Sequence, residues 1–316
     1  MDNMNKEVVF KTYNLCKSYK GRRVLNNVNM TINKGDIYGF VGENGAGKTT
    51  IIRALTGLIN CESGEIELFG VKKSDPNYYK QLERVSAIVE SPSIFPNLSA
   101  FENIIYQQKL LDVENEDMAR NLLGLVGLGG VSDSKKAGNF SLGMRQRLAI
   151  AMCLVASPEF MIFDEPMNGL DPVAISQVRN LILDLNKIKG ITFLISSHIL
   201  SELDLVATKY GIISHGNMVF EDSRANIASR LKKSTIFNTS DDEKAYNLLM
   251  SHGYNAELKD ALIIYDDFNN NDVFKLFIDN NITVKSIETK EASFEDFYLS
   301  LLGGRKNAQF IKSWFL

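Results

Sequence analysis

Cysteines and long hydrophobic runs are scarce in this sequence. Only three cysteines occur among the 316 residues, an odd number without C-x-x-C spacing, so neither a disulfide framework nor a zinc site is predicted. The longest uninterrupted apolar stretch, residues 148–156, spans nine residues, whereas a transmembrane helix needs about 20. Residues 1–10 contain no apolar run of the kind that a secretory signal requires. We therefore expect a protein of a reducing cytoplasm that does not itself cross a membrane.

Basic charge is also unremarkable in amount. The chain has 35 basic and 38 acidic residues, a net charge of -3, and no block rich in lysine and arginine. It lacks the electrostatic surface that nucleic-acid binding requires, so nucleic acid is excluded as an expected partner. The length corresponds to about two domains of ~150 residues, and 45% hydrophobic residues are enough for a buried core.

The N-terminal part contains a strand, a glycine loop and a helix in succession. The apolar run 37–41 leads directly into glycines, and a helical pattern follows Gly47 through Leu58. Before it, strands are expected at residues 7–15 and 27–32. This order is typical of an α/β protein.

A helical insertion is expected next. Ser99 and Glu102 form a capping box, which marks a helix start, and a second helix is expected near residues 117–126. The segment 141–157 is apolar almost all round, as expected for a buried helix. We predict a helical subdomain over residues 91–157.

Two apolar strands complete the predicted core. They cover residues 160–163 and 191–195, with a helix near residues 173–188 between them. Continuous apolar strands that alternate with helices indicate a parallel sheet covered on both faces. This predicts an α/β domain over residues 1–225.

The remaining residues, 226–316, predict a small α+β accessory domain. Charged helices alternate there with short strands in the order β-α-β-β-α-β, which suggests a ferredoxin-like unit. The expected elements are strand 235–238, helix 243–251, strands 256–259 and 261–265, helix 272–279 and strand 282–287. The helix 293–302 has an apolar face that suits packing, and the apolar tail 310–316 either packs, frays, or touches a partner or membrane surface.

A complete phosphate-binding pattern, G-x-x-x-x-G-K-[ST], lies between the first core strand and its helix. Its glycines let backbone amides wrap around phosphates at a helix N-terminus, and the lysine adds a charge at the β- and γ-phosphates. The threonine after it can ligate Mg²⁺, and a chance glycine loop is the alternative. The residues assigned to nucleotide binding are Gly42, Glu43, Asn44, Gly45, Ala46, Gly47, Lys48, Thr49 and Thr50.

Two acids follow the apolar strand 160–163. Asp164 and Glu165 are adjacent, so their side chains point in different directions and can take two roles. We expect Asp164 to hold Mg²⁺ and Glu165 to polarise the water that attacks the γ-phosphate. A solvated loop start is the alternative.

These motifs together resemble the nucleotide-binding subunit of an ATP-binding cassette transporter, over about residues 7–222. The resemblance rests on the phosphate loop, the acid pair, the segments 139–147 and 167–171, and His198. It implies a P-loop NTPase core with a helical insertion. The segments 90–98 and 293–297 more narrowly resemble bacitracin-type and lantibiotic-type ATP-binding proteins.

The resemblance implies a site shared by two subunits. In the family, the helix start at Ser141 and Gly143 meets the γ-phosphate held by the opposite subunit, so two ATP molecules are sandwiched in a head-to-tail dimer. Leu142 and Met144 depart from the family pattern, which usually has glycine and glutamine there. Asp171 lies where the family couples the two sites, with a turn aspartate as the alternative.

Three further side chains take roles by their place in the family pattern. Tyr19 would stack on adenine, with packing within a strand as the alternative. His198 would bind the γ-phosphate. The expected catalytic residues are therefore Lys48, Glu165 and His198. Glu90 stands where most relatives carry glutamine, and we expect it to contact Mg²⁺ and couple closure to a membrane partner; a solvated loop acid is the alternative. The other histidines, His215 and His252, are assigned to structure.

The predicted function is ATP hydrolysis that drives separate membrane-spanning permease subunits. The chain would act with a second ATP-binding subunit, identical or different, at the cytoplasmic face of the membrane. The narrower resemblance implies export of a peptide antibiotic. Two alternatives are a translation-associated or other soluble ATPase, and a nucleotide-gated regulator that barely hydrolyses ATP.

Overall fold

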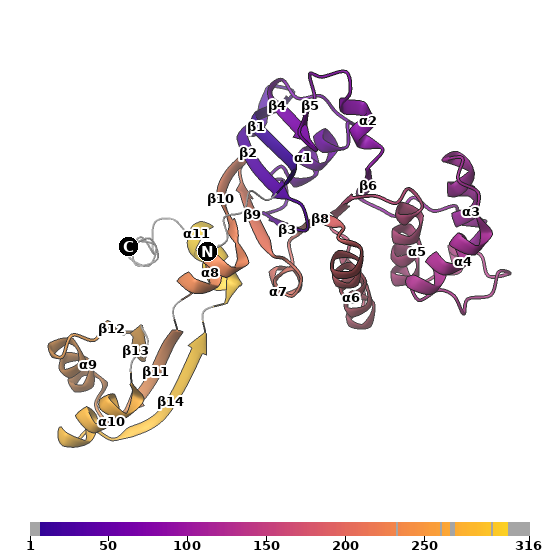
Figure 1. Ribbon diagram of the computed structural model, residues 1–316. Coiled ribbons are helices and arrows are strands. Elements are labelled where there is room, and N and C mark those ends of the chain that lie inside the picture. Colours follow the sequence, from indigo (N-terminus) through magenta and orange to yellow (C-terminus); the bar gives the residue numbers. More distant parts are fainter. Residues whose placement is uncertain (1–6, 232, 260, 266–268, 292, 303–316) are drawn as a thin grey trace. The chain divides into compact units, whose positions relative to one another are not determined.

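The computed structural model describes residues 7–231, 233–259, 261–265, 269–291 and 293–302. These residues fall into two compact units, one up to Arg224 and one from Ala225 onward (Figure 1). The apolar tail 310–316 lies outside the described residues. None of the helices in the described ranges is both long and apolar enough to cross a bilayer.

A six-stranded sheet forms the centre of the first unit. Its order is β10 (Asn217–Ser223), β9 (Lys209–Ser214), β3 (Ile37–Val41), β8 (Thr192–Ser197), β7 (Phe160–Asp164) and β6 (Val85–Ile88). All neighbours are parallel except β10, which is antiparallel to β9. Every residue of β3, β7 and β8 is buried, because a parallel sheet is covered on both faces. The predicted α/β class is confirmed.

The three buried strands end at one edge of the sheet. There β3 runs into the phosphate loop and helix α1 (Lys48–Leu55), and β7 and β8 run into the segments with the predicted acids and His198. The loop packs closely against β9, since a Cβ atom at Gly42 would lie 2.5 Å from the Ile213 carbonyl oxygen. This close approach explains why glycine opens the loop.

A second, antiparallel sheet has the order β2 (Arg22–Asn33), β1 (Val8–Tyr19), β4 (Ser63–Leu68) and β5 (Val71–Lys72). Strands β1 and β2 extend beyond the predicted strands 7–15 and 27–32. Irregular pairing around Asn14 and Asn27, both with positive φ, carries the more polar ends of both strands into the ladder. The short helix α2 (Tyr78–Leu82) was not predicted.

Four helices of the first unit closely follow the prediction, namely α3 (Ala100–Leu110), α4 (Glu116–Leu125), α5 (Leu142–Leu154) and α6 (Pro172–Lys189). The short 3-10 helix η1 (Ala137–Asn139) and the short helix α7 (Leu200–Asp204) were not predicted. The predicted capping box is present: the Ser99 amide donates to Glu102 Oε2 at 2.6 Å, and the Glu102 amide donates to Ser99 Oγ at 3.2 Å. The Ser99 amide lowers the pKa of Glu102, because it stabilises the carboxylate form.

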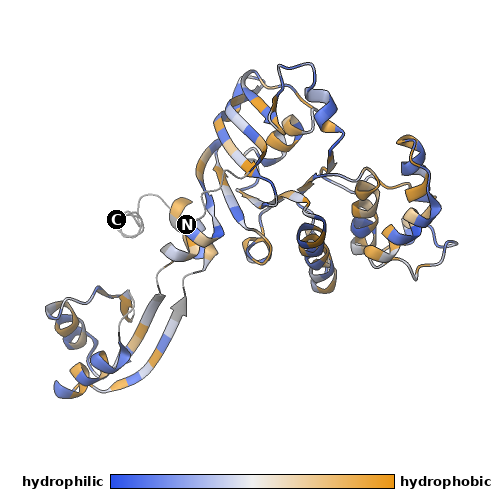
Figure 2. Cartoon of the chain, in the orientation of Figure 1, coloured by the Kyte–Doolittle hydropathy of each residue, from blue (hydrophilic) through white to orange (hydrophobic). Residues whose placement is uncertain are grey.

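The second unit has the predicted β-α-β-β-α-β order. Its elements are β11 (Lys233–Thr239), α9 (Asp242–Ser251), β12 (Ala256–Leu258), β13 (Leu262–Tyr265), α10 (Asn270–Asp279) and β14 (Val284–Glu291), preceded by α8 (Arg224–Arg230) and followed by α11 (Phe294–Leu302). The antiparallel sheet has the order β12-β13-β11-β14, which is ferredoxin-like. Hydrophilic residues predominate along β14 (Figure 2), where Val284 and Ile287 are the two hydrophobic residues.

Candidate nucleotide-binding and catalytic site

A cavity of about 810 Å³ opens at the carboxyl edge of the six-stranded sheet, a size that suits a small-molecule ligand. It is bordered by the phosphate loop, the ends of β1 and β2, the segments after β7 and β8, and the β9–β10 turn. The predicted residues that line it are Tyr19, Glu43, Asn44, Gly45, Gly47, Lys48, Thr49, Thr50, Glu165 and His198. A second cavity, of about 890 Å³ beside α4, contains none of the predicted site residues. Chemistry rather than size therefore identifies the site.

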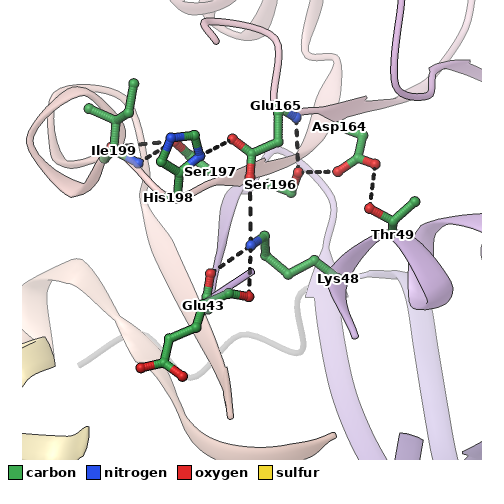
Figure 3. Close-up of polar contacts among 10 residues, drawn as sticks. Glu43, Lys48, Thr49, Asp164, Glu165, Ser196, Ser197, His198 and Ile199 are labelled. Atoms are coloured by element: carbon green, nitrogen blue, oxygen red, sulfur yellow. Dashed lines mark hydrogen bonds and ion pairs between the residues drawn. The ribbon is translucent and has the colours of Figure 1, made fainter. Parts of the chain in front are cut away.

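The phosphate loop closes around its own lysine. Lys48 is buried, and its Nζ donates to the Gly42 carbonyl oxygen at 2.6 Å and to that of Glu43 at 3.4 Å (Figure 3). Gly45 and Gly47 have φ angles of 81° and 115°, in the left-handed region that favours glycine. The ammonium is thus held in the loop at the N-terminus of α1, where an anion would bind.

Asp164 is held by two hydroxyl groups. Thr49 Oγ1 donates to its Oδ2 at 2.8 Å, and Ser196 Oγ donates to its Oδ1 at 2.5 Å (Figure 3). These hard oxygen atoms fit Mg²⁺, which takes few protein ligands and completes its shell with water and phosphate. Thr49 and Asp164 could therefore hold the metal.

Glu165 faces a different set of partners from its neighbour. Its Oε1 lies 3.6 Å from Lys48 Nζ, and its Oε2 lies 2.5 Å from Nδ1 of His198 (Figure 3). Its backbone has φ 54°, and its amide donates to Ser196 Oγ at 2.9 Å. The two acids diverge, as expected, because Ser196 fixes one side chain and the backbone of the next residue. A carboxylate, an ammonium and an imidazole are thereby gathered at one point of the cavity.

His198 keeps one ring nitrogen available. Its Nδ1 pairs with Glu165, while Nε2 makes no hydrogen bond to the part of the chain that the structure describes. The imidazole is partly exposed, with 42% of its side chain accessible. It can therefore contact a ligand in the cavity without losing the carboxylate that orients it.

Three predicted residues lie apart from this cavity. Ser141 caps α5 by accepting the Met144 amide at 3.2 Å, and Gly143 approaches α6 so closely that a Cβ atom would lie 2.5 Å from Ala174 Cβ. Glu90 pairs with Arg53 of α1 and is not among the lining residues.

Asp171 has a local role at the start of a helix, which differs from the turn aspartate named as the alternative. Its Oδ1 accepts the Ala174 amide at 2.9 Å and caps α6.

Several lining residues were missed from the sequence. Arg22, Arg23 and Asn168 border the cavity, and His215, which we had assigned to structure, borders it as well. Ser196, which organises both acids, was not among the predicted site residues. A hydroxyl at the carboxyl end of a buried strand was the available signal for it, whereas the arginines and His215 carry no motif.

Comparisons with known proteins give the family. Residues 25–168 match the ABC transporter family. The bacitracin transport ATP-binding protein BcrA of Bacillus licheniformis is 40% identical over 306 residues, which cover 94% of this chain and 98% of that protein. The lantibiotic transport ATP-binding protein SrtF of Streptococcus pyogenes is 42% identical over 232 residues, which cover 72% of this chain and 98% of that protein.

Solved structures agree with this assignment. The structure of cbiO1 from Clostridium perfringens, described as part of the ABC transporter complex cbiONQ, has a TM-score of 0.63 at 26% identity and covers 71% of this chain and 92% of its own. A dimeric ATP-binding cassette bound to ADP and Pi has a TM-score of 0.60 at 23% identity, covers 68% and 98%, and shares the fold. With a relative 40% identical along nearly its whole length, the chain belongs to the ABC transporter family, as an ATP-binding and ATP-hydrolysing subunit.

Proposed function

We propose that this subunit powers the export of a peptide antibiotic of the bacitracin or lantibiotic class. This export would protect the cell that contains the subunit against the antibiotic. The observation that carries this proposal is the extent of the likeness to the bacitracin transport protein, which covers 98% of that relative. Residues 1–225 would form the ATPase domain and residues 226–316 an accessory domain. The shorter lantibiotic relative leaves more than a quarter of this chain without a counterpart, so bacitracin-like cargo is favoured.

Different residues of the cavity would bind the triphosphate and activate the attacking water. Lys48 and the loop amides bind the β- and γ-phosphates, where they stabilise the charge that develops in phosphoryl transfer. Glu165 orients and polarises the attacking water, and His198 donates to a γ-phosphate oxygen through Nε2. Support comes from the 2.5 Å contact between Glu165 and His198 and from the proximity of Lys48 to the same carboxylate.

Mg²⁺ would be bound by Thr49 and Asp164. When bound, it would supply positive charge that offsets the negative charge of the phosphates. Ser196 holds Asp164 in place for this role from the opposite oxygen. Tyr19, 43% exposed at the edge of the cavity, would stack on adenine.

This chain would work with a second ATP-binding subunit and with membrane-spanning permease subunits. Ser141 and Gly143 stand at a helix start outside the cavity of their own chain, so they would serve nucleotide held by the facing subunit. The chain would bind the permease at the cytoplasmic face of the membrane. Glu90 would couple the closure of the two ATP-binding subunits to the permease. Its pairing with Arg53 connects its segment to α1, the helix that begins at Lys48.

A strain that lacks this subunit tests the cargo. We expect its deletion to raise sensitivity to bacitracin or to a lantibiotic, and the wild-type gene, but not a Glu165→Gln variant, to restore resistance. A membrane-spanning protein should copurify with both the wild-type subunit and the Glu165→Gln variant. Unchanged sensitivity to both peptide classes would contradict the proposed cargo.

Steady-state hydrolysis separates the transport reading from its alternatives. A nucleotide-gated regulator would show equal, very low ATPase activity in the wild type and in Glu165→Gln. A translation-associated factor is disfavoured, because the relatives that match along most of the chain are transport ATP-binding proteins.

A further inference from the structure

A histidine that we had assigned to structure faces the nucleotide cavity. His215 lies in the turn between β9 and β10, and both it and Gly216 line the cavity. The side chain is exposed and makes no hydrogen bond or ion pair with any residue that the structure describes. An imidazole offers a donor and an acceptor when neutral and two donors when charged. His215 is therefore available to a ligand.

The turn is fixed against the phosphate loop. The Gly216 amide donates to the Ala46 carbonyl oxygen at 3.0 Å, and the Gly216 carbonyl oxygen accepts the Asn26 amide at 2.8 Å. A Cβ atom at Gly216 would lie 2.4 Å from the Val24 carbonyl oxygen, so only glycine permits this approach. These contacts set the position of His215 relative to any nucleotide in the loop.

The strand order shows which end of the nucleotide His215 meets. The phosphate-loop strand β3 lies between β8 and β9, and β7 follows β8. Glu165 and His198 come after β7 and β8, so the γ-phosphate end lies on that side. His215 comes after β9 on the other side, where β10 packs beside β2. His215 thus meets the part of the nucleotide that lies away from the γ-phosphate.

The wall around His215 is positively charged. Arg22 and Arg23, at the start of β2, line the same cavity, and Arg22 pairs across the hairpin with Tyr19. Arg22 makes no ion pair with the described part of the chain. A cationic wall favours an anionic group over a neutral sugar.

We propose that His215 is a further nucleotide-binding residue that donates a hydrogen bond to the α-phosphate, the phosphate that ATP and ADP share. The inference rests on the proposed role of the cavity in binding the triphosphate. Because His215 contacts a group that does not react, it contributes equally to ground-state and transition-state binding.

Calorimetric titration of the full chain with ADP and with a non-hydrolysable ATP analogue tests this proposal. His215→Asn is the suitable variant, because asparagine tolerates the left-handed φ of 47° at this position. We expect affinity for both nucleotides to fall by about tenfold or more, as for loss of one hydrogen bond to a charged group. The KM for ATP should rise by a similar factor while kcat stays near the wild-type value.

A second histidine provides the control. His252 caps the end of α9, and its Nδ1 lies 2.9 Å from the Leu248 carbonyl oxygen, so His252→Asn should leave nucleotide affinity unchanged. Wild-type affinity in His215→Asn would overturn the inference, as would a loss confined to the ATP analogue, which would place His215 at the γ-phosphate. If the wild type binds neither nucleotide, the proposed function fails instead, so the two failures are distinguishable.

Discussion

The two compact units differ in how their polar side chains are used. In the first unit, reactive groups follow directly after the buried parallel strands β3, β7 and β8, and a dense network joins Lys48, Asp164 and Glu165 to their neighbours. In the second unit, the described residues enclose an apolar core that includes Phe237 and Phe277, and polar groups mainly cap helices. The fold alone therefore does not carry function; loops at the ends of rigid strands do.

Removing the lysine from the phosphate loop would give the largest effect. We expect Lys48→Ala to lower steady-state ATPase activity by about 100-fold or more, since it removes the charge that stabilises the transferred phosphoryl group. Phosphate release from ATP measures this. The matched control is Lys189→Ala, an exposed lysine at the end of α6, which should retain full activity. ATPase activity above a third of the wild-type value in Lys48→Ala would contradict the view that the loops of the first unit carry the function.

Two buried phenylalanines allow the units to be compared directly. Phe163 in β7 and Phe277 in α10 are both fully buried, so replacing either by alanine should destabilise its own unit by about 3–5 kcal/mol. Phe163→Ala should also reduce ATPase activity, because β7 positions Asp164 and Glu165. Phe277→Ala should leave turnover near wild type below its unfolding transition. Denaturant unfolding and ATPase assays measure both, and an equal loss of turnover would show that the units are energetically coupled.

The smallest effect on stability is expected at the pair of Arg53 and Glu90. Both side chains are substantially exposed, at 41% and 59%, so Arg53→Ala should change the free energy of unfolding by about 1 kcal/mol or less. The functional comparison uses Glu90→Ala and Glu90→Gln in cells, where we expect the alanine variant to transport less than the glutamine variant. Equal transport by both variants and the wild type would remove Glu90 from the coupling pathway.

Much of the fold followed from local sequence patterns. The apolar strands 160–163 and 191–195 and the capping box at Ser99 were predicted within a residue or two, because burial on both faces and helix capping leave direct marks in the sequence. The full lengths of β1 and β2 were not, because irregular pairing admits polar residues that a strict alternation excludes. The order of helices and strands in the second unit was predicted correctly. No function was predicted for this unit.

The site was predictable where one contiguous motif supplies it and less so where distant segments meet. The phosphate loop, Asp164 and Glu165 all appear in the cavity network. His215 and Arg22 reach the cavity only through the packing of the β9–β10 turn against β2, a long-range contact that no local pattern encodes. The pairing of Glu90 with Arg53, 37 positions apart, likewise depends on tertiary structure.

The role of Glu165 is tested most directly by comparing Glu165→Gln with the wild type for both MgATP affinity and turnover on the same preparation. We predict that the variant binds MgATP at least as tightly as the wild type and hydrolyses it about 100-fold or more slowly, because the amide occupies the same space but cannot polarise water as a base. Turnover at the wild-type rate with unchanged affinity would contradict this prediction.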